Sequence, residues 1–340
     1  MQRIIEGKTR ATAKRPAAPP SPGALAAVTR VLVDEGSEGQ RLDNFLMKLL
    51  KGVPKTHVYR VIRSGEVRVN KGRASADTRL ALGDEVRVPP VRMAEPKNEA
   101  AVPPREFPVL FEDEHLIAID KPAGVAVHGG SGVSFGVIEQ LRRARPEARF
   151  LELVHRLDRE TSGLLLLAKK RSALTALQDQ FRNRETGKTY AALVPGEWPV
   201  SKKVIDVPLH KFLTPEGERR VRVVDADHAD GRRSITLVKV VQRLPGYTLL
   251  DVTIKTGRTH QIRVHLASAG HAIVGDEKYG DFAANKALAA GKNAGRIKFA
   301  RMFLHARRLR FEHPASGEVI ELVSPLPEDC AAFVEALAST

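Results

Sequence analysis

Of the features of this sequence, a polar segment with three prolines, residues 93–106 (MAEPKNEAAVPPRE), most constrains the fold. It separates two regions that have the apolar patterns of folded structure. Such a segment has little apolar surface to bury, so it is typical of a linker between folded parts. We therefore predict a small module over residues 31–92 and a larger domain over residues 107–340. Residues 1–30, rich in alanine, proline and basic residues, lack the periodicity of a packed element and are predicted to form a disordered basic tail.

The charge of the chain indicates which kinds of molecule it is expected to bind. The formal net charge is +15 and the pI is about 10.1, a balance typical of proteins that meet a polyanion. Nucleic acid is the first candidate and an anionic membrane surface is the second. No apolar stretch is long enough to span a membrane, and the single cysteine, Cys330, cannot form an internal disulfide, so a cytoplasmic protein is expected.

The small module carries a concentration of basic residues. Its pattern predicts two short helices followed by a hairpin and a closing strand. Bases gather on the second helix and the hairpin, with few acids among them; those expected to bind RNA are Lys55, Arg60, Arg63, Arg68 and Arg73. A run of charge is usually just a solvated face, but the clustering in one segment favours a binding surface.

Strand patterns dominate the larger domain. Residues 150–157 predict a strand that leads to Asp158, residues 163–170 predict a strand that leaves it, and the chain is expected to turn at residues 161–163. No regular alternation of strand and helix is present, which favours a mixed, mostly antiparallel sheet with flanking helices. The whole chain is thus predicted to be α+β, with a small α/β module ahead of this domain.

Asp158 is an isolated acid between Arg156 and Arg159 in the segment VHRLDRETSG, residues 154–163. An aspartate at such a turn can simply accept hydrogen bonds from backbone N–H groups. A carboxylate fixed at a strand end can also act as a nucleophile. Arginines beside it favour its ionised form, so the local charge predicts a permanently ionised acid rather than a proton donor.

Two further segments gather residue types that carry chemistry. In residues 256–280, Thr259 is a plausible N-cap for a helix that Gly270 would end, and Arg258, His260 and Arg263 crowd its start. A metal site built from the histidines of this segment is rejected, because no cysteine or carboxylate frame accompanies them and the bases would repel a cation. Tyr190, in KTYAALV, is either a half-buried strand tyrosine or an aromatic platform for a nucleobase, worth about 1–3 kcal/mol.

Together, the segments HRLDRETSG, KTYAALV and TGRTHQIRVHLASAGH resemble the signatures of the RluA-type pseudouridine synthases. The segments RLDNFL, VPKTHVYRVIRSGEVRVNKGR and GDEVRVP resemble an S4-type RNA-binding module. The order of the two is similar to the enzymes that act on large-subunit (23S) ribosomal RNA, and to their C-type subgroup in particular. The resemblance covers most of the chain from about residue 31 onward.

The resemblance implies an isomerase that detaches uracil from ribose, turns the base and rejoins it through C5, without a cofactor or a metal. It implies that Asp158 is the indispensable acid, that Tyr190 lies against the base, and that Arg263 pairs with the acid. Arg156, Arg159, Arg258 and His260 are expected to contact RNA. The partner is expected to be large-subunit ribosomal RNA, bound by a monomer.

Three alternatives were weighed against this interpretation. A synthase of the same family acting on other ribosomal or transfer RNA uridines is the nearest. A non-catalytic, ribosome-associated RNA binder predicts that Asp158, Tyr190 or Arg263 has been lost, and all three are present. A retaining glycosidase would need a second carboxylate as its acid; Glu160 is close in sequence, but the surrounding bases suit RNA better than a neutral sugar.

Overall fold

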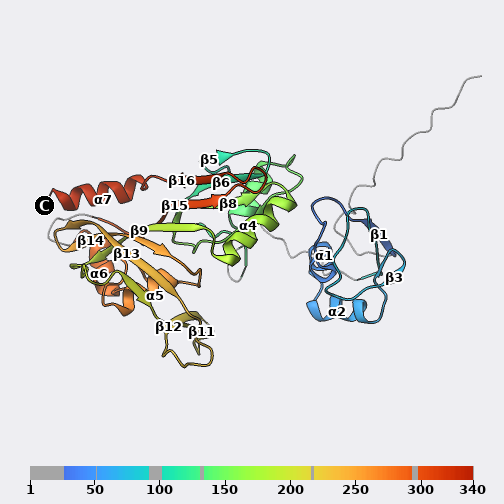
Figure 1. Ribbon diagram of the computed structural model, residues 1–340, viewed down its shortest axis with the longest axis horizontal. Coiled ribbons are helices and arrows are strands. Elements are labelled where there is room, and N and C mark those ends of the chain that lie inside the picture. The colour runs from blue at the N-terminus through green and yellow to red at the C-terminus, as the bar shows by residue number, and fades with distance from the viewer. Residues whose placement is uncertain are drawn as a thin grey trace, which may run out of the picture. The chain divides into compact units, whose positions relative to one another are not determined.

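The computed structural model describes residues 27–50, 52–91, 102–130, 134–215, 218–292 and 298–339 (Figure 1). The chain divides into two compact units, Met1–Glu99 and Ala100–Thr340. Apart from residues 27–30, the predicted tail lies outside the described residues, as does the predicted linker apart from residues 102–106. Strand β1 (Thr29–Leu32) takes in the last two residues that had been assigned to the tail.

The first unit is a four-stranded sheet with two helices. Helix α1 spans Leu42–Leu49, helix α2 spans Lys55–Arg63, and the sheet order is β1-β4-β2-β3. The other strands are β4 (Glu85–Val88), β2 (Arg68–Val69) and β3 (Gly72–Arg73). Apolar residues at helical spacing, among them Leu42, Leu46 and Val58, are fully buried against the sheet residue Val86. This core holds the basic side chains of α2 on the outside.

Each strand of this small sheet contributes an arginine to one continuous row. Arg30 pairs with Arg87, Arg87 with Arg68, and Arg68 with Arg73 in the strand register. Residues directly opposite one another project from the same face of a sheet, and like charges in that position destabilise it. Part of this repulsion is offset at the end of α2, where Arg87 donates to the carbonyl of Glu66 at 2.6 Å.

The second unit is built on a ten-stranded sheet, and all its described pairings except that of β8 with β15 are antiparallel. The mixed, mostly antiparallel sheet expected from the sequence is confirmed. In sheet order the strands are β10 (Val204–Asp206), β13 (Ile235–Leu244), β14 (Tyr247–Ile254), β9 (Gly187–Pro195), β15 (Leu304–Glu312), β8 (Ser162–Ala168), β6 (Leu116–Lys121) and β5 (Val109–Glu112). Strand β16 (Val319–Val323) pairs with β15, and β7 (Glu152–Leu153) pairs with β8.

Strand β8 explains the aliphatic run after Asp158, because both faces of the strand are covered. Leu165 and Leu167 pack against helix α3 (Val137–Ala144), while Leu164 and Leu166 pack against helix α4 (Arg171–Asn183). The strand expected over residues 150–157 is shorter, since only β7 forms there. The turn lies at residues 159–160, and Ser162 and Gly163 already belong to β8.

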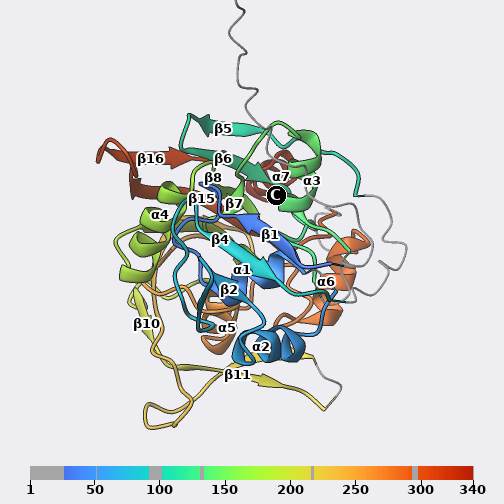
Figure 2. The same cartoon turned by 90° about the vertical axis from the view of Figure 1, so that its right-hand side faces the viewer.

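Several elements of the second unit were not expected from the sequence. Strands β11 (Leu209–Leu213) and β12 (Arg219–Val223) form a separate hairpin, which lies on the side of the unit opposite β5 in both views (Figures 1 and 2). Helices α6 (Phe282–Ala289) and α7 (Glu328–Ala338) were also missed, whereas α5 (Gln261–Ser268) was expected.

Among the helices of the described ranges, none is both long and apolar enough to cross a membrane.

Candidate active site

Three segments far apart in the sequence meet at the middle of the large sheet. In the register of strands β8, β15 and β9, Ala306 lies between Gly163 and Tyr190. Gly163 has φ of 107° and approaches β15 so closely that an added Cβ would clash with the carbonyl oxygen of Ala306. A glycine is therefore required here. The close approach puts the loop that carries Asp158 beside Tyr190, and strand β14 next to β9 delivers helix α5.

A cavity of about 470 Å³ opens at this junction. Ligand pockets commonly occupy about 300–1,000 Å³. Residues of the three predicted segments line it together with the end of α4; they include His155, Arg156, Asp158, Phe181, Arg182, Arg184, Lys188, Tyr190, Arg258, Thr259, His260 and Arg263. Most of its charged lining residues are cationic, so the cavity suits an anionic ligand.

Asp158 is held by an arginine that is itself held by a second acid. Arg263 Nη1 lies 3.2 Å from Asp158 Oδ2, and its Nε and Nη2 donate to Asp276 at 2.7 and 2.8 Å. Burial opposes the charge on Arg263, but the two carboxylates outweigh it and raise its pKa. Burial likewise opposes the charge on Asp276, yet the arginine holds the pKa of that carboxyl below its usual range. Asp276 thus fixes the guanidinium, which leaves one edge for Asp158.

His260 faces Asp158 as well. It has φ of 52° and is the residue that precedes α5, so the N-cap expected at Thr259 is wrong by one position. Its Nε2 lies 3.8 Å from Asp158 Oδ2, and its Nδ1 lies 2.7 Å from Tyr279 Oη. Burial lowers the pKa of His260 despite the attraction of Asp158. A non-glycine residue with positive φ carries backbone strain, which is concentrated at functional sites.

Lys121, at the end of β6, secures the other side of the Asp158 loop. Its side chain is fully buried, and Nζ donates to the carbonyls of Pro122, Val125 and Arg159 at 2.8, 2.8 and 3.1 Å. Burial lowers its pKa to about 7. The three carbonyls favour the ammonium form, because a neutral amine has only two N–H donors. The residue after Asp158 is therefore fixed through its backbone.

Tyr190 lines the same cavity from strand β9. Burial, together with the negative charge of Asp158, raises the pKa of its hydroxyl, so the phenol stays protonated at neutral pH. Ala306 lies opposite Tyr190 on β15, and Val252 lies opposite it on β14. These pairings fix the position of the ring at the cavity wall.

Comparison with known proteins identifies the family. Residues 115–268 match the RNA pseudouridylate synthase family, and residues 40–86 match the S4 domain. "Ribosomal large subunit pseudouridine synthase C" of Escherichia coli (strain K12) is 50% identical over 308 residues, which cover 88% of this chain and 93% of that protein. The chain belongs to the RNA pseudouridylate synthase family. The synthase is 48% identical to the protein of the same name from Haemophilus influenzae over 317 residues, 91% of this chain and 95% of that one.

A solved structure agrees with this assignment. "Human RNA Pseudouridylate Synthase Domain Containing 4" superposes with a TM-score of 0.55 at 26% identity, over 68% of this chain and 92% of that chain. The enzyme class expected from the sequence, an RNA pseudouridine synthase, and the order of S4 domain and catalytic domain are confirmed.

The residues expected to contact RNA fall in both units of the synthase. Arg156, Arg258 and His260 line the cavity around Asp158, whereas Arg159 is exposed and donates from Nε to the carbonyl of Gly124 at 2.9 Å. In the first unit, the exposed residues Lys55, Arg60 and Arg63 lie on α2. Arg68 and Arg73 face each other on β2 and β3, where Arg73 also donates to the carbonyl of Ser64 at 3.4 Å.

A layer of side chains on the α4 side of the cavity was not predicted from the sequence. His155 stacks on Phe181 with ring centroids 4.7 Å apart, and Lys188 Nζ lies 5.3 Å from the Phe181 centroid. His155 accepts the N–H of Leu166 at Nε2, and burial lowers its pKa to about 4, so it is neutral. Arg184, at the end of α4, has φ of 66°. The arginines at the end of α4 were the sequence signal that could have predicted this side of the cavity. Asp276 and Tyr279 were not predicted as site residues, although both lie in the segment 256–280 that the sequence pointed to.

Proposed function

We propose that this synthase isomerises specific uridines of large-subunit ribosomal RNA to pseudouridine, with Asp158 acting at the anomeric carbon. The observation that carries the proposal is the position of Asp158. Its side chain is 22% exposed in a mostly cationic cavity, and it contacts the guanidinium of Arg263, which Asp276 fixes. The substrate class is supported by the names of relatives that share about half of their sequence with this chain.

In this reaction the N1–C1′ bond breaks, uracil turns and the C5–C1′ bond forms. The hydrogen of C5 is released as a proton, and N1 takes up a proton, so the product is an isomer of the substrate. Asp158 either bonds to the sugar or stabilises the charge that develops at C1′. Arg263 orients the acid, and the ring of Tyr190 supports the turning base. The groups in these roles belong to one cavity of one chain, which supports action as a monomer without a cofactor or metal.

We propose that His260, oriented by a chain of hydrogen bonds, steadies the charge of Asp158 from 3.8 Å away. The N–H of Val221 donates to Tyr279 Oη at 3.1 Å, and the hydroxyl proton is then available for His260 Nδ1. A neutral imidazole that accepts at Nδ1 carries its proton on Nε2, the nitrogen that faces Asp158. The His260 ring would thus face Asp158 Oδ2, the same oxygen that Arg263 contacts. The contact with RNA that the sequence suggested for His260 stays a prediction beside this role.

RNA binding is proposed to draw on both units. A uridine within a helix must be flipped out at a cost of a few kcal/mol, and phosphate contacts by Arg156, Arg159 and Arg258 can offset it. We propose residues 31–92 as the S4-type RNA-binding module. The row of Arg30, Arg87, Arg68 and Arg73, together with Lys55, Arg60 and Arg63 on α2, supports this, because a bound phosphate backbone would relieve the repulsion along the row. Such a substrate implies a cytoplasmic protein.

The test is tritium release from 5-tritiated uridine in transcribed large-subunit ribosomal RNA. Wild-type protein is expected to release tritium, and Asp158→Asn is expected to lose the activity while RNA binding survives. Asp251→Asn is the matched control, because Asp251 pairs with Arg307 at 3.5 Å outside the cavity. Normal release by Asp158→Asn would refute the assignment of the acid. Release from transfer RNA but not from ribosomal RNA would refute the substrate.

A further inference from the structure

A second cavity, of about 500 Å³, adjoins the catalytic one. The hairpin strands β11 and β12 and the loop that follows them form most of its wall. Arg258 and Thr259 line both cavities, so the two are neighbours that share a wall. The buried residues Leu209 and Val221 give the second cavity an apolar part.

The cations of this cavity lack hydrogen-bond and ion-pair partners among the described residues, whereas two cations near it are paired. Among the residues that the structure describes, Lys211, Arg232 and Arg258 have no hydrogen bond or ion pair from their side chains. By contrast Arg233 pairs with Asp206 at 2.9 Å, and Lys278 pairs with Glu218 at 2.7 Å. Cations left unpaired on one concave surface attract an anion and can bind a phosphate group.

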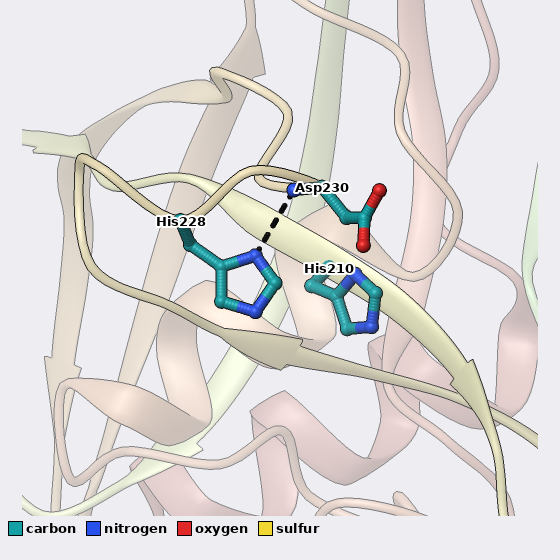
Figure 3. Close-up of side chains that lie close together, drawn as sticks. All are labelled: His210, His228 and Asp230. Atoms are coloured by element: carbon teal, nitrogen blue, oxygen red, sulfur yellow. Dashed lines mark hydrogen bonds between the residues drawn. The ribbon is translucent and has the colours of Figure 1, made fainter.

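His210 and Asp230 line this cavity. Together with His228 they could be taken for a metal site, since one ligand atom from each of the three lies within 4.8 Å of the others (Figure 3). Their hydrogen bonding argues against it. His228 Nδ1 accepts the backbone N–H of Asp230 at 3.1 Å, which places the proton of the neutral ring on Nε2. A metal at Nε2 would require this proton to leave, and a metal at Nδ1 would break the hydrogen bond to Asp230. Lys211, Arg232 and Arg258 outnumber the carboxylate of Asp230 in the cavity lining, so the cavity suits an anionic ligand better.

Aromatic rings line up along the same strand. The rings of His210 and Phe212 are nearly parallel, with centroids 6.3 Å apart and planes at 7°. Arg222 Cζ lies 5.3 Å from the Phe212 centroid, and the His228 ring lies 4.9 Å from that of His210. Rings and guanidinium planes in such a row offer stacking surfaces for unpaired bases.

We propose that the second cavity binds the RNA nucleotide adjoining the target uridine, with its phosphate on Lys211 and Arg232 and its base against His210. The inference rests on the proposed function and extends it to a second subsite. Arg258, in the shared wall, is placed to contact the phosphate that links the two nucleotides. RNA is favoured over other anions because phosphate-binding cations, stacking rings and an apolar part occur together.

The hairpin is fastened to the active site, so a nucleotide bound in this cavity has a defined position relative to Asp158. The N–H of Val221 donates to Tyr279 Oη, and Lys278 Nζ donates to the carbonyl of Arg219 at 2.7 Å. Both contacts come from the segment that also carries Asp276, the partner of Arg263. Filling the second cavity would therefore help to position the flipped uridine at the acid.

Two adjacent arginines give a matched test. Arg232→Ala removes a cation of the cavity, and Arg233→Ala removes one that is paired outside it. With full-length protein and a ribosomal RNA fragment, Arg232→Ala and Lys211→Ala are each expected to raise Kd about tenfold or more and to reduce the slope of log Kd against log salt by about 0.7–0.9. Arg233→Ala is expected to leave both unchanged, and Arg232→Lys to restore much of the affinity.

Two results would overturn the inference. One is that Arg232→Ala and Lys211→Ala, with melting temperatures like that of wild type, bind RNA and release tritium as Arg233→Ala does. The other is saturable binding of zinc alone, measured by calorimetry on the full-length protein and lost in His228→Ala. Tritium release by wild type is measured in the same assay. Its absence would refute the proposed function, whereas its presence with unaffected variants would refute the second subsite alone.

Discussion

Arg263 touches two carboxylates, and the structure predicts opposite consequences for removing each. Asp276 has no exposed side-chain surface and accepts two hydrogen bonds from the guanidinium, besides the backbone N–H groups of Lys278 and Tyr279 at 2.9 and 3.0 Å. Asp158 is 22% exposed and makes one contact of 3.2 Å with the same arginine. Asp276 should therefore support the fold, and Asp158 should support the reaction.

The expected magnitude for Asp276→Asn follows from that geometry. Breaking a buried ion pair costs about 3–5 kcal/mol, and asparagine retains an oxygen that can still accept some of these bonds, so we expect about 3 kcal/mol. A domain of this size loses about 2–4 °C in Tm per kcal/mol. The expected fall in Tm is therefore about 6–12 °C. Asp158→Asn is the matched control and should change the free energy of unfolding by less than about 1 kcal/mol.

The pH dependence of this effect has a definite sign. The pKa of Asp276 is lowered in the folded protein, so its contribution is present above the unfolded value of about 3.9 and is lost as the pH falls through the folded value. Protonated Asp276 resembles asparagine. The difference in Tm between wild type and Asp276→Asn should thus be constant from about pH 5 to 8 and should shrink below about pH 4.

Thermal unfolding followed by circular dichroism, with tritium release measured on the same samples, checks both parts. Asp276→Asn should unfold early and should retain some activity at low temperature, whereas Asp158→Asn should unfold like wild type and lose activity by on the order of 10⁴-fold or more. An unchanged Tm for Asp276→Asn would show that the buried pair does not hold the site. A fall of similar size in Asp158→Asn would show that the two acids are not divided in this way.

Two further predictions use matched pairs. Gly275 has φ of 76°, and an added Cβ would clash with a backbone carbonyl, whereas Gly246, with φ of 73°, has open space there. Gly246→Ala should lower the free energy of unfolding by about 1–2 kcal/mol, and Gly275→Ala should lower it by about 3 kcal/mol or more beyond that. Equal losses of stability in thermal melts would contradict the steric argument. Tyr279→Phe removes the hydroxyl that contacts His260 and should lower kcat about five- to tenfold at unchanged KM, with an altered pH profile. The control Tyr247→Phe should leave kcat and the pH profile unchanged. An unchanged kcat and pH profile for Tyr279→Phe would refute the proposed hydrogen-bond chain that orients His260 toward Asp158.

The local hydrophobic pattern predicted helices and strands correctly where a segment buries one face and exposes the other. The alternation in residues 85–88 and the helical spacing in residues 42–49 predicted elements that formed, because each buries one face. Patterns that are mostly basic or short were missed, as in β11 and β12. Helix α7 carried usable signals, since Pro327 precedes it and Glu328 and Asp329 occupy its first turn.

The sequence by itself determined that an isolated acid lies among bases after a strand, that a buried strand follows it, and that the chain has the signatures of its family. It also determined the separate basic module, because charge and periodicity are properties of a segment. The resemblance implied that Arg263 pairs with that acid, but only the tertiary structure decided how the pair forms and which other groups meet it. Arg263 is 105 residues from Asp158 in the chain, and it arrives there because β15, from the end of the chain, inserts between β8 and β9.

The same holds for Asp276, for the orientation of His260, and for the second cavity beside the site. Each depends on the order and register of strands, and strand order is set by packing between segments distant in sequence rather than by the hydrophobic period of any one of them. Periodicity predicts which face of a strand is buried. It does not predict which other segment packs against that face, and in this protein those neighbouring segments complete the candidate active site.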